Sequence, residues 1–224
     1  MKRSEINTKL KEAARFFDSM SFKLPPWAYW SKNEWSDNWD STHEIRENAL
    51  GWDLTDFGSG NFLDRGLLLF TIRNGTFGSN IYNKPYAEKI MIVEESQITP
   101  MHYHWNKMED IINRGGGNLM IQLFVADEND KLSNKDVSVK IDGIEKKLKA
   151  GTIVTLTPGE SICLVPKLYH KFWGEKGKGR VLVGEVSMVN DDANDNNFIE
   201  KCGRFPAIEE DELALYPLCN EYTR

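Results

Sequence analysis

Short strand-like runs separated by turn residues dominate the chain from Trp52 onward, and they constrain the fold more than any other feature. Each run is apolar or alternates apolar with polar residues, and Gly, Asn, Asp or Pro stands between successive runs. Runs of this length at this spacing are typical of an antiparallel β-barrel or β-sandwich. The strand predictions are 67–73, 87–95, 118–126, 137–141, 152–156, 161–165 and 180–186.

The segments that flank these runs have a different character. Ile6, Leu10, Ala13 and Phe17 recur at helical spacing, which predicts a capped amphipathic helix over about residues 4 to 20. The proline- and tryptophan-rich stretch 24–39 disfavours helix and predicts an irregular aromatic arm. We therefore expect one structural domain with an N-terminal helix and arm (1–60) packed on a β-barrel (61–205), followed by a tail (206–224) with one short helix.

Charge, cysteines and hydropathy exclude several classes of protein. The balance of 28 Lys and Arg against 34 Asp and Glu gives a net charge of −6, which disfavours a nucleic-acid partner. The cysteines Cys163, Cys202 and Cys219 are odd in number and widely spaced, which predicts a reducing, cytoplasmic compartment. The charged N-terminus and the absence of a long apolar run predict no export and no membrane span.

The glycine- and lysine-rich stretch 174–179 lacks the order of a phosphate-binding loop and precedes a predicted strand. It is therefore predicted to be a hairpin turn.

The stretch 100–109 carries the strongest chemical signal. His102 and His104 stand two residues apart, so on a strand both side chains point to the same face and can bind one metal ion. Glu109 follows a bend and can return toward them, and His170 follows a strand and a proline-containing turn. The predicted metal ligands are therefore His102, His104, Glu109 and His170.

Three imidazoles and one carboxylate suit a borderline divalent ion such as Mn²⁺, Fe²⁺, Co²⁺, Ni²⁺ or Zn²⁺, and disfavour a thiolate or all-oxygen site. The alternative interpretation is that His102 and His104 are core histidines with satisfied hydrogen bonds. The remaining histidine, His43, has no spaced partner and is excluded from the metal set.

Two resemblances follow from these residues. His102, His104, Glu109 and Gly116 match the first motif of the cupin superfamily, whereas the second motif, around Pro166 to His170, is one residue shorter and lacks its usual glycine. More closely, the chain resembles the D-lyxose isomerase family over most of residues 1 to 220, through PPWAYW, HYHWNKMEDIINRGGGNLMIQLF and GEVSMVNDDANDNNF.

The family resemblance implies a mainly β, cupin-type double-stranded β-helix (jelly-roll) barrel that holds a manganese-dependent aldose–ketose isomerase site. The substrate pair it implies is D-lyxose and D-xylulose, with D-mannose and D-fructose as analogues, interconverted through a metal-stabilised enediol. A small pentose or hexose is then the expected partner.

Catalytic roles are assigned to two further residues. Glu185 shares a strand face with Val181 and Val183, so it points into the barrel, where a carboxyl of raised pKa is a suitable acid and base. Lys107 is expected to add positive charge near the developing oxyanion. The alternative for Glu185 is a structural ion pair with Lys107 or Arg204.

The predicted substrate contacts share polar or aromatic character close to the expected site. Amide, carboxylate and guanidinium groups bond sugar hydroxyls, and aromatic rings pack against the C–H face of a sugar. The predicted contacts are Gln122, Asp192, Asp195, Arg204, Trp27 and Phe172.

Two other functions remain open at this point. The first is an O₂-dependent cupin oxidoreductase, in which the same ligands would hold iron. The second is a cupin that binds a sugar without converting it. A homodimer is also expected, because the arm tryptophans Trp30, Trp35 and Trp39 are predicted to be exposed.

Overall fold

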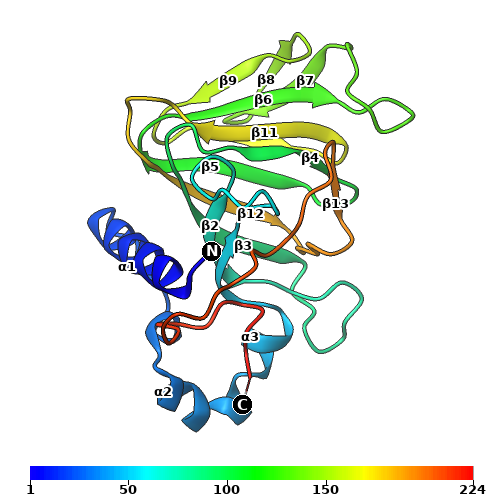
Figure 1. Ribbon diagram of the computed structural model, residues 1–224. Coiled ribbons are helices and arrows are strands. Elements are labelled where there is room, and N and C mark those ends of the chain that lie inside the picture. The colour runs from blue at the N-terminus through cyan, green and yellow to red at the C-terminus, as the bar shows by residue number, and fades with distance from the viewer. Residues whose placement is uncertain (224) are drawn as a thin grey trace.

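Two antiparallel sheets form the body of the protein, as seen in a computed structural model that describes residues 1–223 (Figure 1). The eight-stranded sheet has the order β1-β2-β3-β12-β5-β10-β7-β8, and the five-stranded sheet has the order β13-β4-β11-β6-β9. The expected mainly β fold with an N-terminal helix is confirmed.

The large sheet contains β1 (Gly51–Thr55), β2 (Leu67–Arg73), β3 (Tyr86–Val93), β5 (Glu109–Gly116), β7 (Val137–Ile141), β8 (Ile144–Leu148), β10 (Ser161–Leu164) and β12 (Val181–Met188). The small sheet contains β4 (Thr99–His104), β6 (Leu119–Val125), β9 (Ile153–Leu156), β11 (Leu168–Gly174) and β13 (Asn196–Phe198). The helices are α1 (Arg3–Ser19), α2 (Lys32–Asp37) and α3 (His43–Glu47), with 3₁₀ turns η1 (Pro26–Tyr29) and η2 (Trp39–Ser41).

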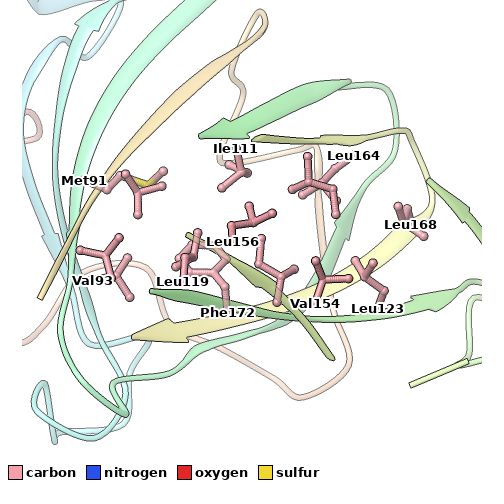
Figure 2. Close-up of a cluster of buried hydrophobic side chains, with 14 of the residues drawn as sticks. Met91, Val93, Ile111, Leu119, Leu123, Val154, Leu156, Leu164, Leu168 and Phe172 are labelled. Carbon is pink, nitrogen blue, oxygen red and sulfur yellow. The ribbon is translucent and has the colours of Figure 1, made fainter. Parts of the chain in front are cut away.

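The main core lies between the two sheets (Figure 2). Alternate residues of β6, namely Leu119, Ile121 and Leu123, are fully buried there, as period-two alternation requires. Leu156, Leu164 and other aliphatic side chains fill the same space from the neighbouring strands. The seven predicted strand ranges lie within two residues of β2, β3, β6, β7, β9, β10 and β12, whereas β1, β5, β8 and β13 were not predicted.

A second core lies outside the large sheet. Ile6, Leu10 and Phe17 of α1 pack against the outer faces of β2 and β3, through residues such as Phe70 and Ile90. Both faces of these strands are therefore buried, which explains why their sequences read as nearly continuous apolar runs. Figure 1 shows α1, in blue, beside this part of the barrel. The predicted helix is confirmed, and it begins at Arg3 with Lys2 as its N-cap residue.

The aromatic arm is more ordered than expected. It forms η1, α2 and η2 instead of an irregular segment, because Ser31 and Glu34 make a capping box at the start of α2. Trp52 donates its indole N–H to the Ala28 carbonyl at 2.8 Å, which fixes the arm to β1. Trp35 is buried, so the expectation of exposed arm tryptophans, from which the homodimer was inferred, is wrong for this residue.

The predicted C-terminal helix is absent from residues 206–223, and an irregular segment packs on α1 instead. Asn7 of α1 donates to the Leu213 carbonyl and accepts from the Leu215 N–H, so it bonds the backbone groups that a helix would pair internally. Arg3 forms ion pairs with Glu210 at 2.6 Å and Glu221 at 2.5 Å. These contacts draw the tail along the N-terminal helix.

The predicted hairpin at 174–179 is also wrong, because this loop crosses from β11 in the small sheet to β12 in the large one. The Glu95 carboxylate accepts hydrogen bonds from the backbone N–H groups of Gly177 and Gly179 and holds the crossing in place. Within residues 1–223, no helix combines the length and apolar character that a bilayer crossing requires.

Replacing Leu10 tests the packing of α1 on the barrel. Leu10 is fully buried, so Leu10→Ala is expected to lower the free energy of unfolding by about 3 kcal/mol through lost apolar contact and a residual cavity. Urea denaturation measures the change. Thr8→Ala, at an exposed position of the same helix, is the control, and equal stability of the two variants would contradict the packing described here.

Candidate metal centre and catalytic cavity

Three histidines meet inside the barrel from two adjacent strands of the small sheet. His102 and His104 alternate along β4, and His170 of β11 stands opposite His102 in the strand register. One nitrogen of each ring lies within 4.8 Å of one nitrogen of the other two. All three side chains are buried, so the sequence-derived set converges in space.

Backbone hydrogen bonds orient two of these rings. Nδ1 of His102 lies 2.8 Å from the Pro100 carbonyl, and Nδ1 of His170 lies 3.0 Å from the Leu168 carbonyl. A carbonyl oxygen only accepts, so each Nδ1 carries the hydrogen and Nε2 presents a lone pair. Burial lowers the pKa of His102 and of His104, which keeps these imidazoles neutral, the form that binds a metal ion.

Glu109, the first residue of β5, adds a carboxylate to the three rings. Its Oε1 lies 3.3 Å from Nε2 of His104 and 3.2 Å from Nε2 of His170. The buried Nε2 of His170 makes no well-formed hydrogen bond within the described chain. An unprotonated Nε2 of His170 that faces a carboxylate fits a divalent metal ion, and the donor set contains no thiolate.

The charge of the cavity also fits a cation. Burial raises the pKa of Glu109, but the Lys107 ammonium outweighs burial, and the net pKa of Glu109 is well below its usual range. Carboxylates outnumber cationic side chains in the connected ion pairs, so a bound cation would offset the excess. The carboxylates are Asp53, Glu109, Glu185 and Asp192, and the cations are Lys89, Lys107 and Arg204.

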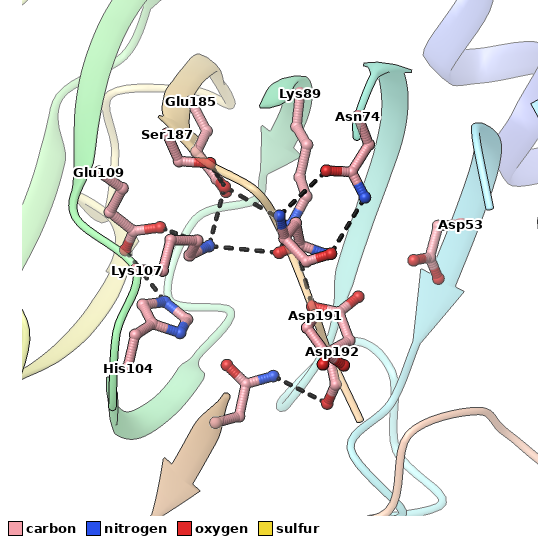
Figure 3. Close-up of polar contacts among 12 residues, drawn as sticks. Asp53, Asn74, Lys89, His104, Lys107, Glu109, Glu185, Ser187, Asp191 and Asp192 are labelled. Atoms are coloured by element: carbon pink, nitrogen blue, oxygen red, sulfur yellow. Dashed lines mark hydrogen bonds and ion pairs between the residues drawn. The ribbon is translucent and has the colours of Figure 1, made fainter. Parts of the chain in front are cut away.

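Lys107 connects the proposed metal ligand to the predicted catalytic carboxylate (Figure 3). Its Nζ lies 2.8 Å from Glu109 Oε2 and 2.9 Å from Glu185 Oε1. Burial lowers the pKa of Lys107, but Glu109 and Glu185 outweigh burial and raise it above the usual lysine range. Lys107 is therefore a fixed cation at the centre of the site.

Glu185 points into the barrel from β12, as its strand parity predicted, but its ionisation differs from the prediction. Burial raises the pKa of Glu185, whereas Lys107 and Lys89 lower it more, and the net pKa lies below the usual glutamate value. The expectation of a raised pKa is wrong in this state, because two lysine ammonium groups face the carboxylate.

Lys89 and Asn190 are part of the site and were missed in the sequence. Lys89 on β3 is buried, and its Nζ lies 3.5 Å from Glu185 Oε1 and donates to Asn190 Oδ1 at 2.6 Å. Asn190 Oδ1 also accepts from Lys107 Nζ at 3.3 Å. A single lysine within the apolar run of β3 was the available signal, since it pairs in register with Glu185.

The three histidines, Glu109, Lys107, Glu185 and Lys89 line a cavity of about 260 Å³ between the sheets. Three of the predicted substrate contacts, Asp192, Arg204 and Phe172, line this cavity. Arg204 pairs with Asp192 at 2.7 Å and with Asp53. Burial raises the pKa of Asp192, but Lys89 and Arg204 outweigh it and hold that pKa far below the usual value.

Three predicted substrate contacts lie elsewhere. Gln122 stands on the face of β6 opposite the core and donates to the Gly151 carbonyl at 3.2 Å. Trp27 packs in the outer core, with its ring 4.9 Å from that of Phe70. Asp195 accepts from the backbone N–H groups of Asn106 and Lys107, so its role is to shape the loop that carries Lys107.

Comparison with known proteins agrees with this geometry. The family model described as D-lyxose isomerase matches residues 1–222. A D-lyxose/D-mannose isomerase of Escherichia coli O157:H7 is 52% identical over 223 residues, covering 99% of this chain and 98% of that protein. A D-lyxose/D-mannose isomerase of Serratia proteamaculans is 50% identical over 225 residues, covering 100% of this chain and 99% of that protein.

The chain belongs to the D-lyxose isomerase family. It is accordingly a sugar isomerase, and the family resemblance seen in the sequence is confirmed. Among solved structures, the L-ribose isomerases of Cellulomonas parahominis and Geodermatophilus obscurus share the fold, each with a TM-score of 0.61 over 93% of this chain and 98% of theirs. At identities of 16% and 17% this likeness concerns the fold alone, and it agrees with the expected β-barrel.

Metal content tests the histidine cluster of this D-lyxose isomerase family member. His170→Ala removes one of the converging nitrogens, so its affinity for Mn²⁺ is expected to fall by more than about 100-fold. Elemental analysis after dialysis measures the retained metal. His43→Ala, which removes the exposed histidine of α3, is the control, and a His170→Ala protein that retains one ion per chain would exclude His170 as a ligand.

Proposed function

We propose that the protein is a metal-dependent aldose–ketose isomerase that interconverts D-lyxose with D-xylulose and D-mannose with D-fructose. The relatives named D-lyxose/D-mannose isomerase support these sugars. The observation that carries the proposal is the Lys107 ammonium between Glu109 and Glu185, because it places an ionised carboxylate beside a metal-binding cluster.

The proposed metal ligands are His102, His104, Glu109 and His170. The nitrogen-rich donor set fits Mn²⁺, Fe²⁺, Co²⁺, Ni²⁺ or Zn²⁺, and the family resemblance favours Mn²⁺. When bound, such an ion supplies Lewis-acid polarisation of the sugar's C1 and C2 oxygens.

Glu185 is the proposed group that moves the proton. Its lowered pKa keeps the carboxylate ionised, so it can remove the hydrogen from C2 of the aldose and return it to C1. In the same reaction O1 gains a proton and O2 loses one, which gives the ketose through an enediol. The Ser187 hydroxyl donates a hydrogen bond to Glu185 Oε1 at 3.1 Å and holds the carboxylate in place.

Lys107 and the far wall of the cavity complete the assignment. The Lys107 ammonium stabilises negative charge that develops on the sugar oxygens, because it is buried and pre-positioned. Asp192 and Arg204 are proposed to bond sugar hydroxyls. Phe172, buried and facing the same cavity, excludes water from the reacting carbons.

The setting of the enzyme is also proposed. Cys163, Cys202 and Cys219 are free, which supports a reducing compartment such as the cytoplasm. Tyr86, Val186 and Met188 are exposed side by side on β3 and β12 and provide a surface for the homodimer in place of the arm tryptophans.

Metal removal and replacement test the proposed function. Chelation is expected to abolish formation of D-xylulose from D-lyxose, and added Mn²⁺ is expected to restore it, with the same rate under anaerobic conditions. Ketose formation measured with and without O₂ separates the three functions. A need for O₂ would favour the oxidoreductase, and Mn²⁺-dependent sugar binding without product would favour the sugar-binding protein.

Glu185→Gln tests the proton transfer. The amide cannot accept the C2 proton, so kcat is expected to fall by about 10²- to 10⁴-fold while metal content stays at the wild-type level. Glu145→Gln, at an exposed position on β8, is the matched control. Full turnover by Glu185→Gln would remove Glu185 as the base.

A further inference from the structure

An extra residue in β4 turns Thr99 toward the catalytic cavity. His170 of β11 faces His102, and Phe172 faces Thr99, so two steps along β11 correspond to three along β4. The bulge includes Pro100, which has no N–H to give to a strand partner. Because the bulge shifts the alternation by one residue, Thr99 and His102 line the same cavity although they stand three residues apart.

The hydroxyl of Thr99 lacks a hydrogen-bond partner. Thr99 is 3% exposed as a whole residue, and its Oγ1 has no hydrogen-bond partner among residues 1–223. By contrast, Thr55, another threonine of the cavity wall, accepts from the Phe57 N–H at 2.9 Å. A buried hydroxyl without a partner destabilises the folded protein, so its presence calls for a ligand that satisfies it.

The surroundings of Thr99 provide no such group from the protein. Phe172 lies opposite it across the strand pair, and Phe198 stacks on the His102 ring with centroids 5.1 Å apart. The charged side chains Lys107 and Glu185 belong to β5 and β12 of the facing sheet or to the loop before it. Phe172 and Phe198 therefore form the cavity wall beside Thr99, and the Thr99 hydroxyl stays available to a ligand in the cavity.

The separation of Thr99 from His102 along β4 places Thr99 near the distal end of a bound sugar. Strand rise puts its Cα roughly 7–10 Å from that of His102, allowing for the bulge. If C1 and C2 lie beside the histidines and Glu185, as the proposed function requires, a five-carbon chain extends toward Thr99 with its distal hydroxyls.

We propose that Thr99 is a specificity-determining residue whose hydroxyl forms a hydrogen bond with a sugar hydroxyl on C4 or C5. This inference rests on the proposed function for the orientation of the sugar. It predicts that the contact is made in both the bound substrate and the transition state, so its loss changes KM more than kcat.

The test compares Thr99→Val, which keeps the shape and removes the hydroxyl, with Thr99→Ser, which keeps the hydroxyl. For D-lyxose, Thr99→Val is expected to raise KM about tenfold with kcat within about twofold of wild type, and Thr99→Ser is expected to recover most of the loss. Thr155→Val on the exposed side of β9 is the control. Either 4-deoxy- or 5-deoxy-D-lyxose, whichever lacks the contacted hydroxyl, is expected to show no difference between wild type and Thr99→Val.

Thermal stability separates a binding role from a structural one. Removing a buried hydroxyl that has no partner is expected to leave Tm of Thr99→Val unchanged or higher, whereas a structural hydroxyl would give a lower Tm. A lower Tm together with an unchanged KM would overturn the proposal.

Binding of a sugar alcohol keeps this inference distinguishable from the proposed function. D-Arabinitol, the reduced form of D-lyxose, has no carbonyl and is not isomerised, so calorimetry gives its Kd without turnover. If wild type binds it about tenfold more tightly than Thr99→Val but forms no ketose from D-lyxose, the proposed function fails and the Thr99 contact stands. Equal Kd and KM values in the two proteins, or no binding of any of these sugars by wild type, would overturn the contact.

Discussion

The ion pairs of the Lys107 ammonium with Glu109 and Glu185 are the interaction on which the site depends. Burying one such charge costs several kcal/mol, and partners at 2.8 Å and 2.9 Å offset that cost only while both carboxylates stay ionised. Lys107 thereby links β5, which carries Glu109, to β12, which carries Glu185. The Asp195 carboxylate accepts a hydrogen bond from the backbone N–H of Lys107 at 2.9 Å. Lys107 is therefore held at its backbone as well as at its ammonium group.

In the proposed function, this arrangement gives the two carboxylates different roles. Glu109 faces histidine nitrogens with one oxygen and Lys107 with the other, which suits a metal ligand. Glu185 faces Lys89, Lys107 and Ser187, and in the proposed function it acts on the substrate. The difference comes from position in the two sheets, since both are buried glutamates beside the same lysine.

The sequence predicted the parts of the site that depend on local spacing. The H-x-H pattern places His102 and His104 on one face of any strand, and the parity of Glu185 with Val181 and Val183 points it inward. Strand parity also explains why Gln122 does not reach the cavity: it alternates with the buried Ile121 and Leu123 and so points away from the core. The position of Thr99 in the cavity wall could not be predicted from the sequence, because a bulge changes the parity of β4.

The remaining differences involve contacts between segments far apart in the chain. Lys89 gains its role from Glu185, which lies opposite it on a strand nearly a hundred residues later. The tail was expected to form a helix from its own pattern, but bonds from Asn7 and Arg3 decide its path. Trp27 was assigned to the sugar by its residue type, whereas packing with Phe70 accounts for it.

The fate of the C2 hydrogen tests the central claim, that a buried carboxylate of this barrel moves a proton in a sugar. The measurement is NMR of the D-xylulose formed from D-lyxose in D₂O. The account predicts deuterium at C1 of the ketose, because the proton held by Glu185 exchanges with solvent before it is returned. Ketose without deuterium, together with full retention at C1 of a label placed on C2 of the aldose, would show a hydride shift and contradict the account.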